Sequence, residues 1–339
     1  MISGSALVGI TLDDQYQVLT RIHTGSGATV YKGYDLQNDR PVAIKAISQH
    51  EFGKHHDAVL RFRREMALLS RIRHPNIIEI YSQGETSYGI AYFVMQWLDG
   101  RTLLDELDDI GQMLLTRIQA IFDPVCEAVA AMHAAGILHR DLKPGNIFLS
   151  RQSDGSEHTT LLDFGIAKPL LTWQGTDFEI SGESVSVGTP EYMSPEQCGE
   201  QELTVASDIY SLGVVLYRML AGRPPFVGPS QYVMARHIAA PPPPLHLYRP
   251  HLSEVVVAVV QQALAKNPAD RFASVLDLRL ALDAAIAATT EDRLYRQPQP
   301  PETDAAGARY RTRQIAALQF DADTLEITQP ALPESEPTP

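Results

Sequence analysis

Cysteine, positive charge and long apolar runs are scarce in this sequence. Its two cysteines, Cys126 and Cys198, are too few for a disulfide framework and lack zinc-ligand spacing, so we interpret both as packing residues in a reducing compartment. The 28 Lys and Arg residues against 41 Asp and Glu give a net charge of −13, which argues against non-specific binding of nucleic acid or anionic lipid. Because no apolar run approaches roughly 18 residues and no charged n-region begins the chain, we expect a soluble, cytoplasmic protein without a membrane span.

Short β-branched and aromatic runs make up most of residues 16–97, and Gly, Asn-Asp and Pro separate them. This pattern predicts a small antiparallel sheet. Residues 57–72 differ, because apolar residues recur there at helical spacing and Glu65 lies among them. A carboxylate on an apolar face needs a partner, so Glu65 is expected to face a cation.

Residues 98–288 are mainly helical in character. Helices are expected at 116–134, 207–220, 252–264 and 275–288. Pro124 predicts a kink or a split in the first of these helices, and Gly136 marks its end. The strand candidates "NIFL" and "TTLLDFG" enclose a polar stretch, 150–158, that is expected to be a turn or small insertion. The Pro-, Thr- and acid-rich residues 289–339 predict a largely disordered tail.

Several short motifs follow one another in a fixed order. In sequence they are Val30 after a glycine-containing loop, "VAIK" with Lys45, Glu65 on the predicted helix, "HRDLKPGN" from His139 to Asn146, "DFG" from Asp163, and "SPE" ending at Glu196. Each motif alone would be an ordinary strand or turn. Chance agreement of the whole ordered set is negligible, and the set is typical of protein kinases.

Residues 16–285 thus resemble the protein Ser/Thr kinase family, most closely the eukaryotic-like (Hanks-type) kinases of bacteria. The resemblance implies an α+β, bilobal protein-kinase fold. A β-rich N-lobe would span 16–97, a mainly helical C-lobe 98–288, and ATP would bind between them. It also implies ATP as co-substrate, Mg²⁺ or Mn²⁺ as cofactor, protein substrates, and autophosphorylation in bacterial signalling.

The same resemblance assigns roles to individual residues. The implied ATP-binding residues are Gly25, Gly27, Val30, Ala43, Lys45, Glu65, Met95, Gln96 and Leu98. Lys45, held by Glu65, would bind the α- and β-phosphates. Asp141 would act as general base, Lys143 would contact the γ-phosphate, and Asn146 is the third residue of the catalytic set. Asn146 and Asp163 offer hard oxygen ligands to the metal ion.

Other positions concern substrate choice and structure. Lys143 resembles a lysine that tyrosine kinases usually lack at this position, and Thr189 resembles the threonine that braces the catalytic loop beside the substrate groove, so the resemblance favours Ser/Thr over Tyr as acceptor. Glu196 is expected to pair with Arg271. Asp208 could be an N-terminal helix acid or the anchor of the catalytic-loop backbone, and both interpretations can hold.

Arg140 directly precedes Asp141, and in the family such an arginine commonly meets an anion on the activation segment. Ser181 and Ser184 are the best-placed phosphorylation sites. Alternatively, Glu179 or Glu183 supplies the charge, or the serines only solvate a loop.

In the tail, a phosphorylated Thr324 followed by Ile327 would resemble a ligand for a phosphothreonine-reading (forkhead-associated) domain, and Thr328 lies nearby. The alternative is that these threonines reflect the composition of a disordered chain.

The glycine loop departs from the family pattern. The fifteen positions between Val30 and Lys45 fix the register, which puts His23, Gly25 and Ala28 where three glycines are usual. His23 brings the affinity for ATP into question. A low-activity kinase or a pseudokinase scaffold is the alternative, although Lys45, Asp141 and Asp163 are all present. A small-molecule kinase would lack the segment "GTPEYMSPE".

Overall fold

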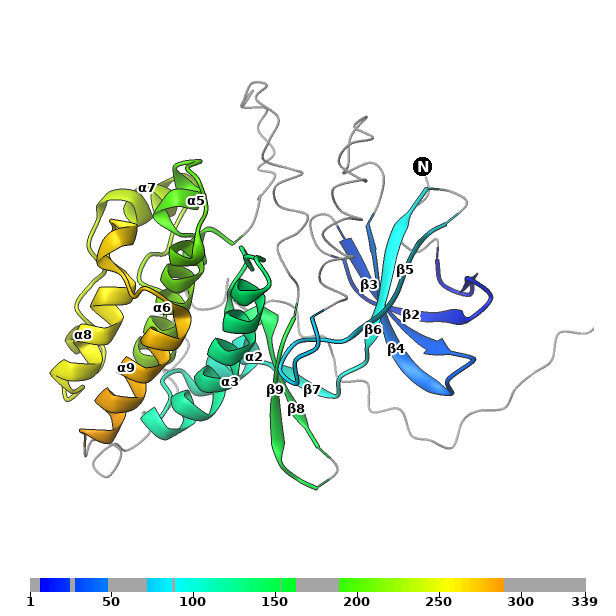
Figure 1. The fold of residues 1–339 in the computed structure, drawn as a ribbon, viewed down its shortest axis with the longest axis horizontal. Coiled ribbons are helices and arrows are strands. Elements are labelled where there is room, and N and C mark those ends of the chain that lie inside the picture. Colours follow the sequence, from blue (N-terminus) through cyan, green and yellow to red (C-terminus); the bar gives the residue numbers. More distant parts are fainter. Residues whose placement is uncertain are drawn as a thin grey trace, which may run out of the picture. The chain divides into compact units, whose positions relative to one another are not determined.

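The computed structural model describes residues 7–24, 28–47, 72–86, 89–152, 154–162 and 189–289 (Figure 1). The predicted helix at 57–72 and the tail at 289–339 fall outside these ranges, apart from residues 72 and 289. Within the described ranges, no helix is both long enough and apolar enough to cross a bilayer.

The N-terminal part is a six-stranded sheet in the order β1-β2-β3-β4-β6-β5, with every neighbouring pair antiparallel. The strands are β1 (Thr11–Leu12), β2 (Tyr16–Thr24), β3 (Ala28–Asp35), β4 (Arg40–Ile47), β5 (Ile80–Glu85) and β6 (Ala91–Gln96). The predicted antiparallel sheet is therefore confirmed. Only the two-residue strand β1 was not anticipated, because it is too short to show a period.

The two faces of this sheet have different surroundings. Side chains alternate along a strand, so Tyr31 and Ile44 lie on the face opposite to Val30 and Lys45. Tyr31, Ile44 and Val94 are buried in a cluster of their own with the N-terminal segment. The face that carries Lys45 is left for the predicted ATP contacts.

A second, three-stranded antiparallel sheet joins β7 (Gly100–Thr102), β8 (Ile147–Arg151) and β9 (Glu157–Leu161). The prediction of a turn over the whole of 150–158 was wrong at both ends. β8 extends to Arg151 and β9 begins at Glu157, because Ser150 pairs with His158 in the ladder.

Backbone bonds connect the second sheet to the segment before β5. The N–H of Leu161 donates to the carbonyl of Asn76 at 2.8 Å, and the N–H of Ile78 donates to the carbonyl of Leu161 at 3.0 Å. The side chain of Asn76 also donates to the carbonyl of Thr159. These bonds explain why β5 begins at Ile80 rather than at the start of the apolar run: residues 76–78 pair with β9 instead.

Seven α-helices lie in the described residues after β7. They are α2 (Leu103–Ile110), α3 (Leu115–Ala134), α5 (Pro195–Cys198), α6 (Val205–Ala221), α7 (Ser230–Ala239), α8 (Glu254–Ala263) and α9 (Val275–Ala287). Short 3₁₀ turns occur at Pro144–Asn146, Pro190–Tyr192, Leu245–Leu247 and Pro268–Asp270. The four helices bounded from the sequence are confirmed to within two residues at each end.

Helix α3 runs without a break through Pro124, so the predicted possibility of a split helix was wrong. Its burial explains the tolerance, because nine residues of α3 pack into the core and outweigh one missing N–H bond. The helix ends at Ala134 with Ala135 as its C-cap, and Gly136 follows with φ +74°, a left-handed conformation that glycine adopts without strain.

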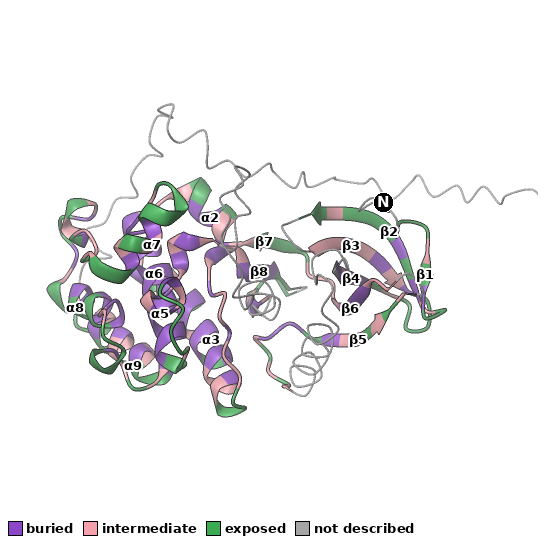
Figure 2. Cartoon of the chain, turned by 90° about the horizontal axis from the view of Figure 1, so that it is seen from above, coloured by how far each residue is buried: buried purple, intermediate pink, exposed green. Residues whose placement is uncertain are grey.

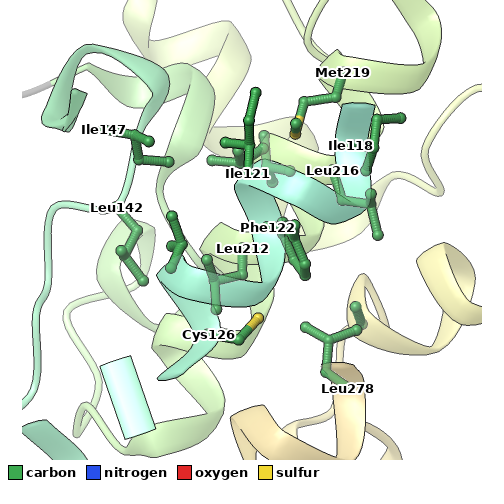
Figure 3. Packing of buried hydrophobic residues seen from close by; sticks show 14 of the residues in the cluster. Ile118, Ile121, Phe122, Cys126, Leu142, Ile147, Leu212, Leu216, Met219 and Leu278 are labelled. Carbon is green, nitrogen blue, oxygen red and sulfur yellow. The ribbon is translucent and has the colours of Figure 1, made fainter. Parts of the chain in front are cut away.

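Helix α6 is the centre of the helical core, since all its residues after Val205 are buried (Figure 2). Leu212 and Leu216 of α6 lie beside Phe122 of α3 (Figure 3). Gly213 allows close approach of α8, because a Cβ there would lie 2.9 Å from the Cβ of Ala263. Cys126 in the same core and Cys198 are both buried, and burial raises their thiol pKa values, that of Cys198 to about 12. The interpretation of both as packing residues is confirmed.

Candidate active site

Four polar side chains predicted from the sequence meet at the loop before β8. The Nζ atom of Lys143 lies 2.9 Å from Oδ2 of Asp141 and 3.5 Å from the hydroxyl of Thr189. Asn146, at the end of the 3₁₀ turn, donates from Nδ2 to the carbonyl of Asp141 at 2.8 Å and to its carboxylate at 3.1 Å. The carboxylate of Asp141 is thus held between an ammonium and an amide.

Leu142 anchors the loop that contains Asp141 in the hydrophobic core. Leu142 is 1% exposed and packs in the cluster that contains Ile147 and Leu212 (Figure 3). The neighbouring residues Asp141 and Lys143 remain partly exposed. The apolar anchor therefore alternates with the polar groups, which leaves the polar groups accessible to a ligand.

Asp208 of α6 holds the backbone of the same loop. Its two carboxylate oxygens accept the N–H of His139 at 2.8 Å and the N–H of Arg140 at 2.9 Å. His133 donates to the same carboxylate from Nε2 at 2.8 Å. Asp208 lies in the first turn of α6 as well, so both sequence interpretations describe its position.

The residues assigned to ATP lie in register on three adjacent strands. Val30 of β3 pairs with Lys45 of β4, and Ala43 pairs with Met95 of β6. Directly paired residues share a face of the sheet, and so do residues two apart on one strand, so these four side chains lie on one face. Lys45 stands 5.9 Å from the centre of the Phe93 ring.

Gln96 and Leu98 follow at the end of β6. The N–H of Gln96 donates to the carbonyl of Glu79 at 2.9 Å. An N–H contact to adenine would therefore come from Trp97 or Leu98 rather than from Gln96.

Several predicted site residues lie outside the described residues: Gly25, Gly27, Glu65, Asp163, Ser181, Ser184, Thr324 and Thr328. Their roles stay predictions. His23, next to the glycine loop, is described and is an exposed residue of β2 paired with Val30.

A profile of the protein kinase domain family matches residues 16–279, which is most of the chain and extends from the start of β2 into the first residues of α9. The chain belongs to the protein kinase family. Of the family's signature residues, Lys143 and Asn146 contact Asp141 directly, and Thr189 contacts Lys143.

Individual kinases show the same relationship. The chain is 38% identical over 282 residues to the serine/threonine-protein kinase pkn2 of Myxococcus xanthus, covering 82% of this chain and 33% of that protein. It is 34% identical over 310 residues to the serine/threonine-protein kinase PknB of Mycolicibacterium smegmatis, covering 88% and 48%. The crystal structure of the Mycobacterium tuberculosis PknI kinase domain superposes with a TM-score of 0.65 at 27% identity, covering 82% of this chain and 98% of that one. The chain thus spans a third to about half of the curated relatives it matches.

In this member of the family, a buried ion pair fixes the segment that follows Thr189. Nη2 of Arg271 lies 2.6 Å from Oε1 of Glu196, and Ser207 donates to the other oxygen. Burial alone would raise the pKa of Glu196, but the bonds and charge of Arg271 outweigh it and hold that pKa below its ordinary value. The pKa of Asp208 is also lowered. Burial would raise it, but the hydrogen-bond donors around the carboxylate outweigh that effect.

Sequence reasoning missed three further anchors of this segment. Nε2 of His237 donates to the carbonyl of Glu191 at 3.1 Å, the hydroxyl of Ser211 donates to the carbonyl of Tyr192 at 2.8 Å, and Arg218 donates to the Tyr192 hydroxyl. Burial lowers the pKa of His237 to about 4, so the ring is neutral at pH 7 and bonds as a neutral donor. No motif in the sequence signals these contacts, because they join α6 and α7 to a loop more than fifteen residues away.

Proposed function

We propose that this chain is an ATP-dependent kinase that phosphorylates serine and threonine in proteins. The proposal is carried by the cluster of Asp141, Lys143, Asn146 and Thr189, whose contacts range from 2.8 to 3.5 Å. Phosphoryl transfer needs a positioned hydroxyl and neutralised phosphate charge, and little covalent chemistry from the protein.

Asp141 would orient the substrate hydroxyl and accept its proton as the oxygen attacks the γ-phosphorus. The bond between the γ-phosphorus and the bridging oxygen breaks, and ADP leaves. Lys143, 2.9 Å from Asp141, would place its positive charge on the transferring phosphoryl group. Thr189 contacts Lys143 from the segment "GTPEYMSPE", which supports a role in placing a Ser or Thr hydroxyl beside the base.

A divalent cation, Mg²⁺ or Mn²⁺, fits the donor set of this site. Both bonds from Asn146 to Asp141 use Nδ2, which orients the amide so that Oδ1 faces away from Asp141. An amide oxygen and the carboxylate of Asp163 are hard ligands of the kind these ions prefer. Asn146 and Asp163 would hold the ion, and the ion would neutralise charge on the phosphate oxygens.

The direct test is transfer of labelled phosphate from ATP to the protein itself and to a generic acceptor such as casein. Wild type is expected to label both, and acid hydrolysis is expected to release phosphoserine and phosphothreonine. Asp141→Asn is the matched control, since it keeps the size of the side chain and removes the base. Equal labelling by the two proteins, or none by wild type, would favour the alternative of a scaffold without catalysis.

We further propose that this kinase autophosphorylates its activation segment, with Ser181 or Ser184 as acceptor and Arg140 as the phosphate partner. Arg140 supports this because it directly precedes the base and Asp208 fixes its N–H. Mass spectrometry of active wild type should find phosphate between residues 163 and 196, and its absence there would exclude this route. A forkhead-associated partner for phosphorylated Thr324 stays a prediction of the sequence.

A further inference from the structure

The carboxamide of Gln197, the third residue of α5, bonds to two different segments. Its Oε1 accepts the N–H of Ser194 at 3.0 Å, which completes the capping box of α5. Its Nε2 donates to the backbone carbonyl of Arg140 at 2.7 Å. Gln197 therefore ties the start of α5, directly after the "TPEYM" segment, to the residue before the catalytic base.

The carbonyl that Gln197 binds belongs to the peptide between Arg140 and Asp141. The N–H of that peptide donates to Nδ1 of His139 at 3.3 Å. Arg140 has φ +66°, a left-handed conformation that a residue with a side chain adopts at a cost. This peptide must be held at both ends to keep Asp141 in place, and Gln197 supplies the bond at its carbonyl.

We propose that Gln197 is a positioning residue for phosphoryl transfer. It orients the Arg140–Asp141 peptide, and it thereby links the position of residues 189–194, which precede α5, to the position of the Asp141 carboxylate. The inference rests on the proposed kinase function. Gln197 is not among the residues proposed to contact ATP or the substrate hydroxyl. It acts through the backbone of Asp141, so its loss should change the rate at saturation more than the binding of ATP.

The simpler alternative is that Gln197 only caps α5. The two roles use different atoms of one carboxamide, and substitutions separate them. Gln197→Glu keeps the oxygen that caps α5 and puts a carboxylate against the Arg140 carbonyl in place of the donor. Gln197→Lys keeps a donor for that carbonyl and loses the cap. A glutamate near a helix N-terminus is favourable and a lysine there is unfavourable, so capping alone ranks the glutamate variant above the lysine variant.

The experiment measures kcat, the KM for ATP and the melting temperature of both variants in the full chain. We expect Gln197→Glu to lower kcat by about tenfold, the effect of one lost hydrogen bond to a catalytic backbone. We expect its KM for ATP to stay within about twofold. Gln197→Lys should be less stable than Gln197→Glu and yet turn over faster. The lysine variant would then have the higher kcat and the glutamate variant the higher melting temperature.

Gln201→Glu and Gln201→Lys are the charge controls, because Gln201 is exposed and lies four residues away. They should keep the kcat of wild type. The inference is overturned if Gln197→Glu turns over as fast as Gln201→Glu, or if activity follows stability across the two Gln197 variants.

Hydrogen exchange separates this inference from the kinase function itself. The peptide covering residues 139–143 should exchange faster in Gln197→Glu than in wild type and in Gln201→Glu. A wild type that transfers no phosphate would refute the kinase function, while exchange at 139–143 would still decide the role of Gln197. Equal exchange in all three proteins would overturn the inference.

Discussion

At the scale of single residues, the candidate site depends on how each polar side chain is held. Asp141 contacts Lys143 and Asn146 within 3.1 Å, and its backbone is held through His139 and Gln197. As the proposed base, Asp141 would meet a substrate hydroxyl in one geometry, and positioning of this kind supplies most of the catalytic gain in phosphoryl transfer.

His23 is the residue that departs most from the family pattern. It is exposed at the end of β2 and pairs with Val30, whose side chain lies on the face of Lys45. In the proposed ATP site, a side chain at this position would restrict the approach of a phosphate, whereas glycine would not. His23→Gly should lower the KM for ATP by about three- to tenfold with kcat retained, since it affects ground state and transition state alike.

Steady-state kinetics with varied ATP measures this effect, and His251→Gly, at an exposed position between α7 and α8, is the control. An unchanged KM would show that His23 leaves the loop free to bind. An inactive wild type made active by His23→Gly would show that the loop had lost its function.

At the scale of elements, the contact between helices α3 and α9 includes several acidic side chains. Gln119 of α3 donates to Asp283 of α9 at 2.6 Å, and Arg279 lies within 3.6 Å of both Glu127 and Asp283. Burial raises the pKa of Asp123 to about 6, and the charge of Asp283 adds to the rise while Arg279 opposes it. The ionised form of Asp123 is therefore disfavoured at this contact between the two helices.

The sign of the pH effect follows from that shift. Folded protein binds the Asp123 proton more tightly than the unfolded chain does, so this group favours folding at low pH, and its contribution is lost as pH rises through about 6. Asp123→Asn removes the titration. At pH 8 the variant should melt about 2–4 °C above wild type, and at pH 5 the difference should shrink.

Melting curves at the two pH values measure this difference. Asp270→Asn, at an exposed position, is the control and should show no such pH dependence. A variant that is less stable than wild type at pH 8 would mean that the ionised carboxylate is well solvated or paired in the folded protein.

At the scale of the whole molecule, the fold and the residues that lie together around Asp141 could be predicted from the sequence because the relevant patterns are local. Strands from β2 to β6 and helices α3, α6, α8 and α9 carry clear periods, and the motif around Asp141 is contiguous. Helix α7 was missed because only Val233 and His237 of its ten residues are buried, which leaves no apolar period to read.

The contacts that orient the site could not be predicted in the same way. Gln197 and Arg140 are 57 positions apart, and His237 and Glu191 are 46 apart. Each contact depends on how α5, α6 and α7 pack, and neither glutamine nor histidine at these positions forms a pattern with its neighbours. Side-chain type alone does not reveal such partners, because every polar residue has many possible ones.

As the proposed base of a phosphoryl-transfer site, Asp141 should be needed for turnover, while the other parts of the site bind ATP independently of it. The measurement that tests this most directly compares Asp141→Asn with wild type for two quantities, the turnover number at saturating ATP and acceptor, and the Kd for ATP. We predict that turnover falls by about 10²–10⁴-fold. The Kd for ATP should stay unchanged, since in the proposed mechanism the carboxylate would contact the substrate hydroxyl rather than the nucleotide. A variant that turns over at the wild-type rate would contradict the account.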